Sequence, residues 1–353
     1  MSLSEDAQRR LRVVWLCLEW PGPNHRGGVA RYAYRLAAEL APIVDLTIIT
    51  ESDGEPLPGA RMRYLPASSS RIDRYYVQPL RARRMVKALR NADVVHAFGD
   101  DWALGRGPWK RVRHFLGLSL SEARSSKGLR RLNHYVLAAL EKYSQFRADF
   151  RIAIGPESRD AFRCDVIMPP VVPIQTPATK KTGEPTVVFV GSYSGRKRGR
   201  LAEEAVRRVS AEIGTEIRLI VFGPADDARN WSAATDHRSG ASDAEVQQAI
   251  SASWALLSPS EYEGFGIPIF EGLALGTAVI ASPNPGSLYQ AQMVGQGGSL
   301  HIAQTPEQLF DDLRARMIRG AELTADQKIA NRTAVDRLVT QASVNTLVDV
   351  AYG

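Results

Sequence analysis

Short apolar runs alternate with amphipathic stretches along the first half of the chain. The apolar runs predict strands, and the stretches between them, with apolar residues at helical spacing, predict helices. We expect strands at residues 12–18, 44–50, 93–97 and 149–154, with helices near 29–40, 75–90 and 128–147. Strands that alternate with helices are typical of βαβ units with a parallel sheet.

The alternation pauses at residues 173–183, which are rich in Pro, Thr and Lys and show no periodicity. Such a segment indicates an interdomain linker. The pattern then restarts, and we expect strands at 186–191, 216–222, 254–258 and 277–281, helices near 199–211, 243–252 and 267–275, and helical sequence from 306 to 351. The fold class is therefore α/β, with two Rossmann-like doubly wound domains facing a cleft.

These patterns also predict domain boundaries. We expect an N-terminal domain at 1–172, a linker at 173–185 and a C-terminal domain at 186–334, with the last helix, about 335–353, packed back on the N-terminal domain. In doubly wound sheets, ligands bind beyond the carboxyl ends of the strands.

Charge is distributed unevenly between the two halves. Residues 1–165 contain 28 Lys and Arg against 18 Asp and Glu, a net charge of +10, whereas the remainder carries −3. One interpretation is an ordinary solvated surface, and the other is a basic face toward anionic lipid or an anionic acceptor. No recognition motif accompanies the charge, so we expect no nucleic-acid partner.

Neither the cysteines nor the apolar runs indicate a secreted or membrane-spanning protein. The cysteines, Cys17 and Cys164, are too few for a disulfide framework or a zinc site. The N-terminus is polar and acidic, and no apolar run approaches the roughly 20 residues that cross a bilayer. We expect a cytoplasmic location, with peripheral attachment to the inner face of the membrane left open. The basic helices near 75–87 and 127–147 are candidate lipid-facing segments, although ordinary packing on a sheet explains each of them as well.

The strongest chemical signal lies at residues 258–276, where a glycine-containing loop follows an expected strand. Pro268 suits the first turn of a helix, and the free N–H groups of that turn would bind a diphosphate. Glu263 and Glu271 are separated by seven residues, so both carboxylates can point into one pocket and accept hydrogen bonds from sugar hydroxyls. The alternative is a surface turn with two solvated glutamates.

Two further loops suit phosphate binding. Gly191 opens a loop that contains Arg196, Lys197 and Arg198, whose charges match a diphosphate, although a solvated basic loop is the alternative. Gly27 and Gly28 open an expected helix, where glycine lets backbone amides approach a phosphate, or where they form a simple tight turn. Neither loop has the spacing of a P-loop or of the dinucleotide fingerprint.

The run from Glu263 to Glu271 resembles the Glu-x7-Glu motif of retaining glycosyltransferases of the GT-B fold, especially glycosyltransferase family 4, and the resemblance extends over most of the chain. It implies transfer of a hexose from a UDP- or GDP-linked nucleotide sugar to a hydroxyl of a glycan or lipid-linked acceptor. The implied setting is cell-surface glycan or glycolipid synthesis. It implies no cofactor, and the chain contains no Asp-x-Asp metal motif, so we expect no essential metal.

The resemblance also implies roles for individual residues. Glu263 would contact the donor sugar and Glu271 the ribose. His114, preferred here to His96, would contact the donor sugar. The donor diphosphate and sugar would face the following backbone and basic groups: Gly27, Gly28, Gly191, Arg196, Lys197, Arg198, Phe265, Gly266 and Ile267.

The chain departs from the family pattern around the donor. Ser192 stands where an arginine is expected, the loop at 282–290 lacks the usual glutamate, and the loop at 237–240, which would frame the base, is unusually polar. Two other interpretations therefore stay open. One is a catalytically inactive GT-B scaffold or binding protein, and the other is a different sugar-nucleotide enzyme, such as an epimerase or a phosphorylase.

Overall fold

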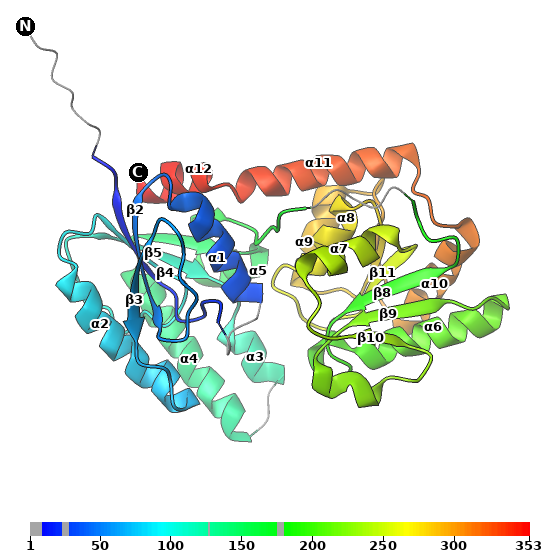
Figure 1. The fold of residues 1–353 in the computed structure, drawn as a ribbon, viewed down its shortest axis with the longest axis horizontal. Helices are drawn as coiled ribbons and strands as arrows, with labels where there is room; N and C mark the ends of the chain where they lie inside the picture. The colour runs from blue at the N-terminus through cyan, green and yellow to red at the C-terminus, as the bar shows by residue number, and fades with distance from the viewer. Residues whose placement is uncertain (1–8, 23–27, 126–127, 175–179) are drawn as a thin grey trace, which may run out of the picture. The chain divides into compact units, whose positions relative to one another are not determined.

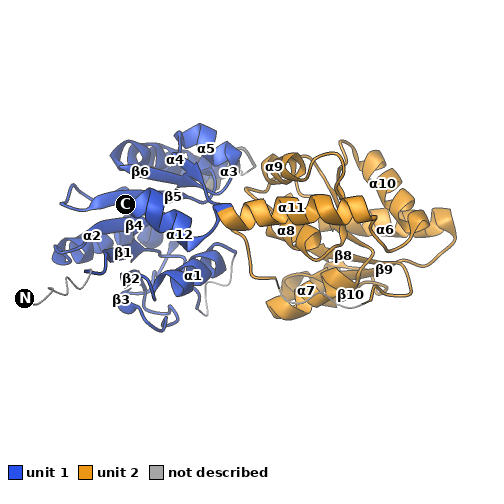
Figure 2. Ribbon diagram, turned by 90° about the horizontal axis from the view of Figure 1, so that it is seen from above, with its two compact units in different colours: residues 1–169, 341–353 blue, residues 170–340 orange. Residues whose placement is uncertain are grey.

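The computed structural model describes residues 9–22, 28–125, 128–174 and 180–353. The chain divides into two compact units (Figure 2). Unit 1 comprises Met1–Pro169 with Gln341–Gly353, and unit 2 comprises Pro170–Thr340. Each is an α/β unit built on one parallel sheet, in agreement with the fold class expected from the sequence (Figure 1).

The sheet of unit 1 has the strand order β3-β2-β1-β4-β5-β6-β7. Its strands are β1 (Arg12–Leu16), β2 (Asp45–Glu51), β3 (Arg61–Leu65), β4 (Val94–Ala97), β5 (Lys110–Phe115), β6 (Phe150–Ala153) and β7 (Val166–Ile167). Its helices are α1 (Gly28–Leu40), α2 (Gln78–Ala88), α3 (Ser119–Ser125), α4 (Gly128–Arg147), α5 (Pro156–Phe162) and α12 (Val344–Thr346), with π-helical turns at Asp73–Val77 and Leu347–Tyr352.

Alternate residues of β1 supply the cores on the two faces of this sheet, because successive strand side chains point to opposite faces. Val13 and Trp15 belong to the cluster that includes α1 and the C-terminal segment. Val14 and Leu16 belong to the cluster that includes α2. The central strand is thus buried on both sides, as is typical of parallel sheets.

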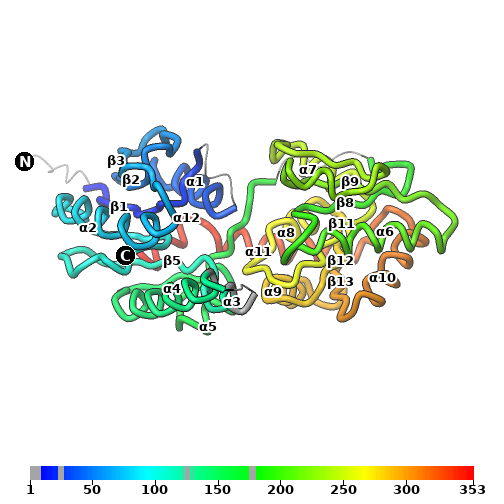
Figure 3. The backbone as a smooth tube through the Cα atoms, turned by 90° about the horizontal axis from the view of Figure 1, so that it is seen from below, coloured from blue at the N-terminus to red at the C-terminus, as the bar shows by residue number. Residues whose placement is uncertain are grey.

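The sheet of unit 2 has the strand order β10-β9-β8-β11-β12-β13, which can be followed in Figure 3. Its strands are β8 (Thr186–Val190), β9 (Arg218–Phe222), β10 (Asp236–Arg238), β11 (Ala255–Ser258), β12 (Ala278–Ala281) and β13 (Leu300–Ile302). Its helices are α6 (Gly199–Ile213), α7 (Asp243–Ala252), α8 (Ile267–Ala274), α9 (Pro285–Val294), α10 (Pro306–Arg319) and α11 (Ala325–Gln341), with 3-10 turns at Gly195–Lys197 and Ala225–Asn230.

Helices cover both faces of this second sheet. Helices α6 and α10 pack against each other on one face, where they share a core with β8 and β9 (Figure 1). Helices α7, α8 and α9 lie on the other face, and α8 contacts both β11 and β12. The carboxyl end of β11 is followed by the loop that leads into α8.

The segment expected to be a linker belongs to unit 2, and its last residues pack against the rest of that unit. The ammonium of Lys181 donates hydrogen bonds to the carbonyls of Ser251 and Ser253, at 2.8 and 3.0 Å, and to the hydroxyl of Thr277 at 2.8 Å. Thr182 accepts from the indole of Trp254 at 2.9 Å through its carbonyl. At the other end of unit 2, α11 runs to Gln341, where the chain returns to unit 1.

Two segments expected to be loops contain regular structure. The segment 282–290 contains the start of α9, whose first turn is capped reciprocally by Asn284 and Ser287. Pro285 occupies the first helical position, where a missing N–H costs nothing. The polar segment 237–240 begins within β10, an edge strand whose side chains are half-buried, so its sequence lacks the apolar alternation of a strand.

Candidate active site

The loop between β11 and α8 is held by two features of α9. The side-chain amide of Gln290 donates to the carbonyls of Phe265 and Gly266, at 2.6 and 3.1 Å. A Cβ on Gly286 would lie 2.4 Å from the Phe265 carbonyl oxygen, so only glycine permits this approach. Gly266 itself has φ 84° at the start of α8, a conformation that favours glycine.

Glu263 emerges from this loop into a basic cluster. Its carboxylate is 2.5 Å from the ammonium of Lys197 and 3.2 Å from the guanidinium of Arg196. The same guanidinium donates to the Tyr262 carbonyl at 2.8 Å. A Cβ on Gly191 would lie 3.0 Å from the Cβ of Lys197, so the glycine after β8 lets the basic turn pack closely.

Electrostatics keep Glu263 ionised in this buried position. Burial by itself raises the pKa of its carboxyl, but the charges of Lys197 and Arg196 and the hydrogen bonds from Lys197 and Ser260 outweigh burial and lower the pKa below its usual value. Only 7% of Glu263 is exposed, whereas the Arg196 side chain is half exposed. The carboxylate therefore stays charged, and the arginine remains accessible to a ligand.

Glu271, one turn into α8, is held from the neighbouring helix. The side-chain amide of Gln247 in α7 donates to the Glu271 carboxylate at 3.2 Å and to the Pro173 carbonyl at 2.9 Å. Glu271 is buried. Its carboxylate is thus positioned by a hydrogen bond that does not neutralise its charge.

The other residues predicted for donor binding are placed differently. Arg198 has φ 55° and lies 3.9 Å from the Glu261 carboxylate, so it pairs outside the Glu263 cluster. Phe265 is buried and Ile267 is the first residue of α8. Gly28 is the first residue of α1, and Gly27 lies outside the described residues.

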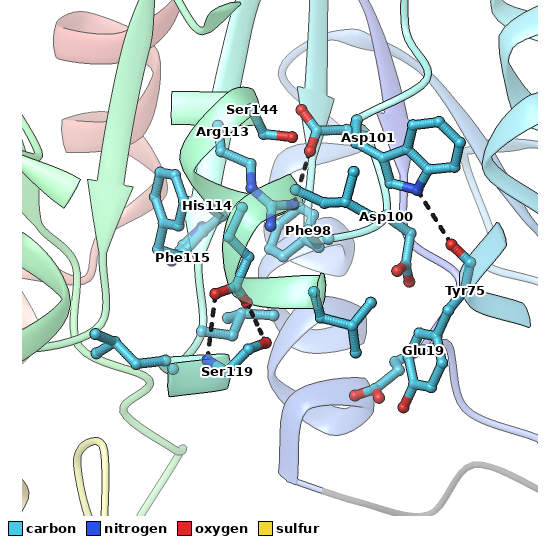
Figure 4. A pocket seen from close by; sticks show the side chains of 18 of the residues that line it. Glu19, Tyr75, Phe98, Asp100, Asp101, Arg113, His114, Phe115, Ser119 and Ser144 are labelled. Atoms are coloured by element: carbon cyan, nitrogen blue, oxygen red, sulfur yellow. Dashed lines mark hydrogen bonds and ion pairs between the residues drawn. The ribbon is translucent and has the colours of Figure 1, made fainter. Parts of the chain in front are cut away.

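Unit 1 contains a pocket of about 220 Å³ beyond the ends of β4 and β5 (Figure 4). His114, at the end of β5, lines this pocket, together with residues of the loop after β4 and one face of α4. Burial, followed by the charge of Arg113, lowers the pKa of His114 to about 3. His114 is therefore a neutral imidazole at physiological pH.

The second candidate histidine, His96, supports His114 from β4. Its ring is parallel to that of His114 within 4°, with centroids 5.6 Å apart. The His96 Nδ1 atom is 2.7 Å from the Tyr352 hydroxyl, which also accepts from the Trp15 indole at 2.9 Å. His96 is thus tied to the C-terminal turn, whereas His114 reaches the pocket.

Several residues that hold these sites were not singled out from the sequence. Gln247 and Gln290 orient the Glu271 carboxylate and the α8 loop, and Asn284 donates to the Ser260 carbonyl at 3.0 Å. A recognisable signal existed for Asn284, since asparagine followed by proline marks a helix start. The glutamines act across helices distant in sequence, and no local pattern marks them.

The described residues offer no group of three or more His, Cys, Asp or Glu arranged to hold a metal ion. Across the described ranges, no helix has the length and apolarity that a membrane span requires.

Solved structures with the same architecture include several sugar-transfer enzymes. WaaG, a glycosyltransferase involved in lipopolysaccharide biosynthesis, matches with TM-score 0.73 and 18% identity over 97% of this chain and 100% of its own. Sucrose-phosphate synthase from Thermosynechococcus elongatus matches with TM-score 0.69 and 17% identity over 96% of each chain. HepE from Anabaena, in complex with UDP-glucose, matches with TM-score 0.67 and 14% identity over 96% of this chain and 97% of its own.

Two family models cover most of the sequence. The model described as Glycosyltransferase Family 4 matches residues 26–176, and the model described as Glycosyl transferases group 1 matches residues 174–328. No curated protein sequence matches the chain significantly. The two family models and the architecture agree with the resemblance carried by the Glu263–Glu271 motif, and the chain belongs to the group 1 glycosyltransferases of the GT-B fold.

Proposed function

We propose that this glycosyltransferase moves a hexose from a UDP- or GDP-linked donor to an acceptor hydroxyl with retention of anomeric configuration. The observation that carries the donor assignment is the buried Glu263 carboxylate beside Arg196 and Lys197 at the start of α8. A carboxylate accepts hydrogen bonds from sugar hydroxyls, and two adjacent cations match a diphosphate. The complexes of HepE with UDP-glucose support a nucleotide sugar as the donor class.

Charge development explains why the cations matter in this proposal. As the bond between the sugar C1 and the phosphate oxygen breaks, negative charge grows on the departing diphosphate. Arg196, Lys197 and the N–H groups at the start of α8 would stabilise that charge without reorganisation, and one such donor is typically worth about 3–4 kcal/mol. The departing phosphate oxygen takes the proton of the acceptor hydroxyl as the new C1–O bond forms on the same face. In this proposal protein cations carry the role that a metal plays in other transferases.

Unit 1 supplies the proposed contact with the donor sugar and a pocket beside it. The pocket there is lined by His114 and by the inner face of α4, including His134 and Ser144. The proposed contact of His114 with the donor sugar uses a neutral imidazole, which donates or accepts one hydrogen bond at each nitrogen.

The outer face of α4 supports a lipid-linked acceptor. Apolar side chains follow it at alternating three- and four-residue spacing, and two of them, Leu129 and Phe146, are 85% and 81% exposed. The exposed members of this stripe, hereafter the α4 stripe, are Leu129, Leu132, Val136, Ala139, Tyr143 and Phe146. Such a continuous apolar face indicates an interaction surface.

Charge supports an anionic membrane as the proposed occupant of the α4 stripe. Arg131 and Arg147 flank it, and the acidic residue of the helix, Glu141, is turned inward to bond Ser119. If a second copy of the chain packed on the stripe, its arginines would face Arg131 and Arg147 and repel them. An anionic bilayer would instead attract these two arginines. The same helix would then place the pocket wall next to a membrane-held acceptor.

Vesicle co-sedimentation tests the membrane proposal. The full chain should bind phosphatidylglycerol vesicles and bind phosphatidylcholine vesicles weakly. Replacing Leu129, Leu132 and Phe146 by serine should abolish binding. The matched control replaces exposed apolar residues of unit 2, Ile318 and Ile329, by serine and should bind like the wild type. Binding that survives the α4 substitutions, or an absence of wild-type binding, would overturn this part of the proposal.

Release of nucleoside diphosphate from a panel of UDP- and GDP-sugars, in the presence of methyl glycosides as acceptors and of EDTA, tests the catalytic proposal. We expect turnover with one donor, lost in Glu263→Gln. Nucleotide binding without sugar release would favour an inactive binding protein instead. Conversion of the nucleotide sugar to its epimer, or release that requires inorganic phosphate, would identify an epimerase or a phosphorylase.

A further inference from the structure

Tyr32 of α1 and His114 of β5 meet in the interior of unit 1, although they are far apart in the sequence. The Tyr32 hydroxyl oxygen is 3.5 Å from the Nε2 atom of His114. The two rings pack edge to face, with centroids 5.5 Å apart and planes at 81°. Both side chains are buried, and His114 also lines the unit 1 pocket. The contact therefore joins α1 to the histidine that is proposed to meet the donor sugar.

Both members of this pair are neutral at physiological pH. Burial, followed by the charge of Glu39, raises the pKa of the Tyr32 phenol above its ordinary value, so the hydroxyl keeps its hydrogen. The pKa of His114, which burial and the charge of Arg113 lower to about 3, leaves its imidazole uncharged. A neutral imidazole carries one hydrogen, on Nδ1 or on Nε2, and the other nitrogen accepts a hydrogen bond.

The hydroxyl hydrogen of Tyr32 distinguishes these two tautomers. Among the described residues, the hydrogen-bond partner of that hydroxyl is His114 Nε2. If Nε2 carried the imidazole hydrogen, it would donate to Tyr32, and the buried hydroxyl hydrogen would have no acceptor among these residues, which is costly. If Nε2 is the acceptor, the hydroxyl donates to it and the imidazole hydrogen lies on Nδ1. The contact therefore favours the Nδ1–H tautomer of His114.

The Nδ1 atom of His114 is left for a ligand. It is buried and has no hydrogen-bond partner in the described part of the chain. In the favoured tautomer it is an N–H donor, and a buried donor without a partner indicates a ligand atom that accepts. Oxygen atoms of a sugar accept such a hydrogen bond.

His96 provides a comparison within the same core. The Tyr352 hydroxyl accepts a hydrogen bond from the Trp15 indole at 2.9 Å, so its own hydrogen is left to donate to His96 Nδ1, which is 2.7 Å away. This contact favours the Nε2–H tautomer of His96. The two stacked histidines should therefore carry their hydrogens on opposite nitrogens, each because of a different tyrosine.

We propose that Tyr32 is a positioning residue that holds neutral His114 in its Nδ1–H tautomer, so that the imidazole donates a hydrogen bond to the donor sugar. The identity of this ligand rests on the proposed transferase function, whereas the tautomer does not. His114 then takes no proton from the acceptor hydroxyl, because Nδ1 already carries a hydrogen and Nε2 accepts from Tyr32. The departing phosphate oxygen keeps the role of base that the proposed mechanism gives it.

NMR of the full chain with nitrogen-15 in its histidine rings tests the tautomer without requiring activity. Two-bond hydrogen–nitrogen correlations distinguish a ring nitrogen that carries hydrogen from one that does not, and the His114 signals are those missing in His114→Gln. At neutral pH we expect hydrogen on Nδ1 of His114 and on Nε2 of His96. In Tyr32→Phe, which keeps the ring but removes the hydroxyl, a measurable share of His114 should carry its hydrogen on Nε2, and His96 should not change.

The matched control is Tyr34→Phe in the same helix. Tyr34 is half-buried and packs against the Trp20 ring, with centroids 5.4 Å apart, rather than against either histidine. Removal of its hydroxyl should leave both tautomers as they are in the wild type.

Initial rates and nucleotide binding on the same variants test the consequence for transfer. Tyr32→Phe should lower kcat about 10-fold, because the hydrogen bond from His114 to the sugar is weakened. Its dissociation constant for UDP or GDP should not change, since a free nucleoside diphosphate has no sugar for His114 to contact. Tyr34→Phe should match the wild type in both quantities.

The outcomes separate this inference from the proposed function. Hydrogen on Nε2 of wild-type His114, a His114 tautomer that Tyr32→Phe does not change, or wild-type turnover in Tyr32→Phe would each overturn the inference and leave the transferase proposal standing. Failure of the wild type to transfer sugar from any UDP- or GDP-linked donor would overturn the transferase proposal, and the NMR spectra would still decide the tautomer.

Discussion

The ammonium of Lys197 lies 2.5 Å from the carboxylate of Glu263 and ties the turn after β8 to the loop before α8. The pair joins the basic and acidic motifs of unit 2, which are far apart in sequence. Together with Arg196, the pair forms a cluster of three charges, in which the Glu263 carboxylate is buried and the Arg196 guanidinium is exposed. A diphosphate that binds here would share the two cations with Glu263, so affinity and turnover should respond differently to changes in the cluster.

Glu263→Gln should separate these two responses. Removal of the carboxylate releases Lys197 and Arg196 from their partner, so the dissociation constant for UDP or GDP should stay the same or decrease. Turnover should fall at least about 100-fold if Glu263 contacts the donor sugar during transfer. Calorimetry and initial rates measure the two quantities. Equal losses of affinity and rate would instead indicate that the loop had collapsed.

Lys197→Met should weaken nucleoside diphosphate binding by about 10- to 100-fold, because one charge-assisted hydrogen bond is lost. Lys328→Met, a lysine of α11 that pairs with Glu322 on the surface of unit 2, is the matched control and should bind like the wild type. Uridine, which lacks phosphates, should bind both variants equally. A similar loss for uridine and UDP would contradict a phosphate contact at Lys197.

Asp100 should make stability depend on pH. The pKa of its carboxyl is about 6 in the folded protein against 3.8 as the ordinary value, so its stabilising contribution is complete below about pH 4 and is lost as pH rises through 6. Asp100→Asn should therefore be more stable than the wild type at pH 7.5, by about 1–3 kcal/mol, and equally stable at pH 4. Urea unfolding at the two pH values measures this difference. A constant difference at both pH values would contradict ionisation of the half-buried Asp100.

Gly286→Ala should disturb the α8 loop through backbone contact alone. The added Cβ would lie 2.4 Å from the Phe265 carbonyl oxygen and 2.5 Å from its carbon, and neither atom can rotate away. We expect a loss of about 1–3 kcal/mol in unfolding free energy and weaker nucleotide binding. Gly297→Ala, whose Cβ would meet no atom within 4 Å, should have little effect on either quantity. A stable Gly286→Ala variant with normal nucleotide affinity would show that this approach does not position the loop.

The sequence predicted the buried strands better than the strands at the edges of the two sheets. β1, β8 and β11 are continuous apolar runs, which the parallel sheet buries on both faces. β3 and β10 lie toward sheet edges; β3 has two arginines among its five residues and β10 is polar throughout, so neither forms a continuous apolar run. Edge strands are stabilised by pairing with one neighbour, so their side chains need not be apolar.

For the candidate site, the sequence predicted residues within one motif better than contacts between distant segments. Glu263 and Glu271 lie in one short motif, and their loop and helix positions follow from Gly266 and Pro268. The pairing of Glu263 with Lys197 crosses from one strand loop to another. The pairing of Arg113 with Asp101 likewise joins β5 to the loop after β4. Contacts between distant segments require the sheet order, which the periodicity of one sequence does not specify.

Thermal unfolding with a panel of nucleoside diphosphates and their sugars, without added metal, tests the central claim most directly. At 100 times its dissociation constant, a ligand adds about 2.7 kcal/mol to the free energy of unfolding. The account predicts a clear rise in Tm with one UDP- or GDP-linked donor, reduced in Glu271→Ala, which removes the carboxylate proposed to hold the ribose. Absence of a shift with every member of the panel would contradict a nucleotide-sugar site in unit 2.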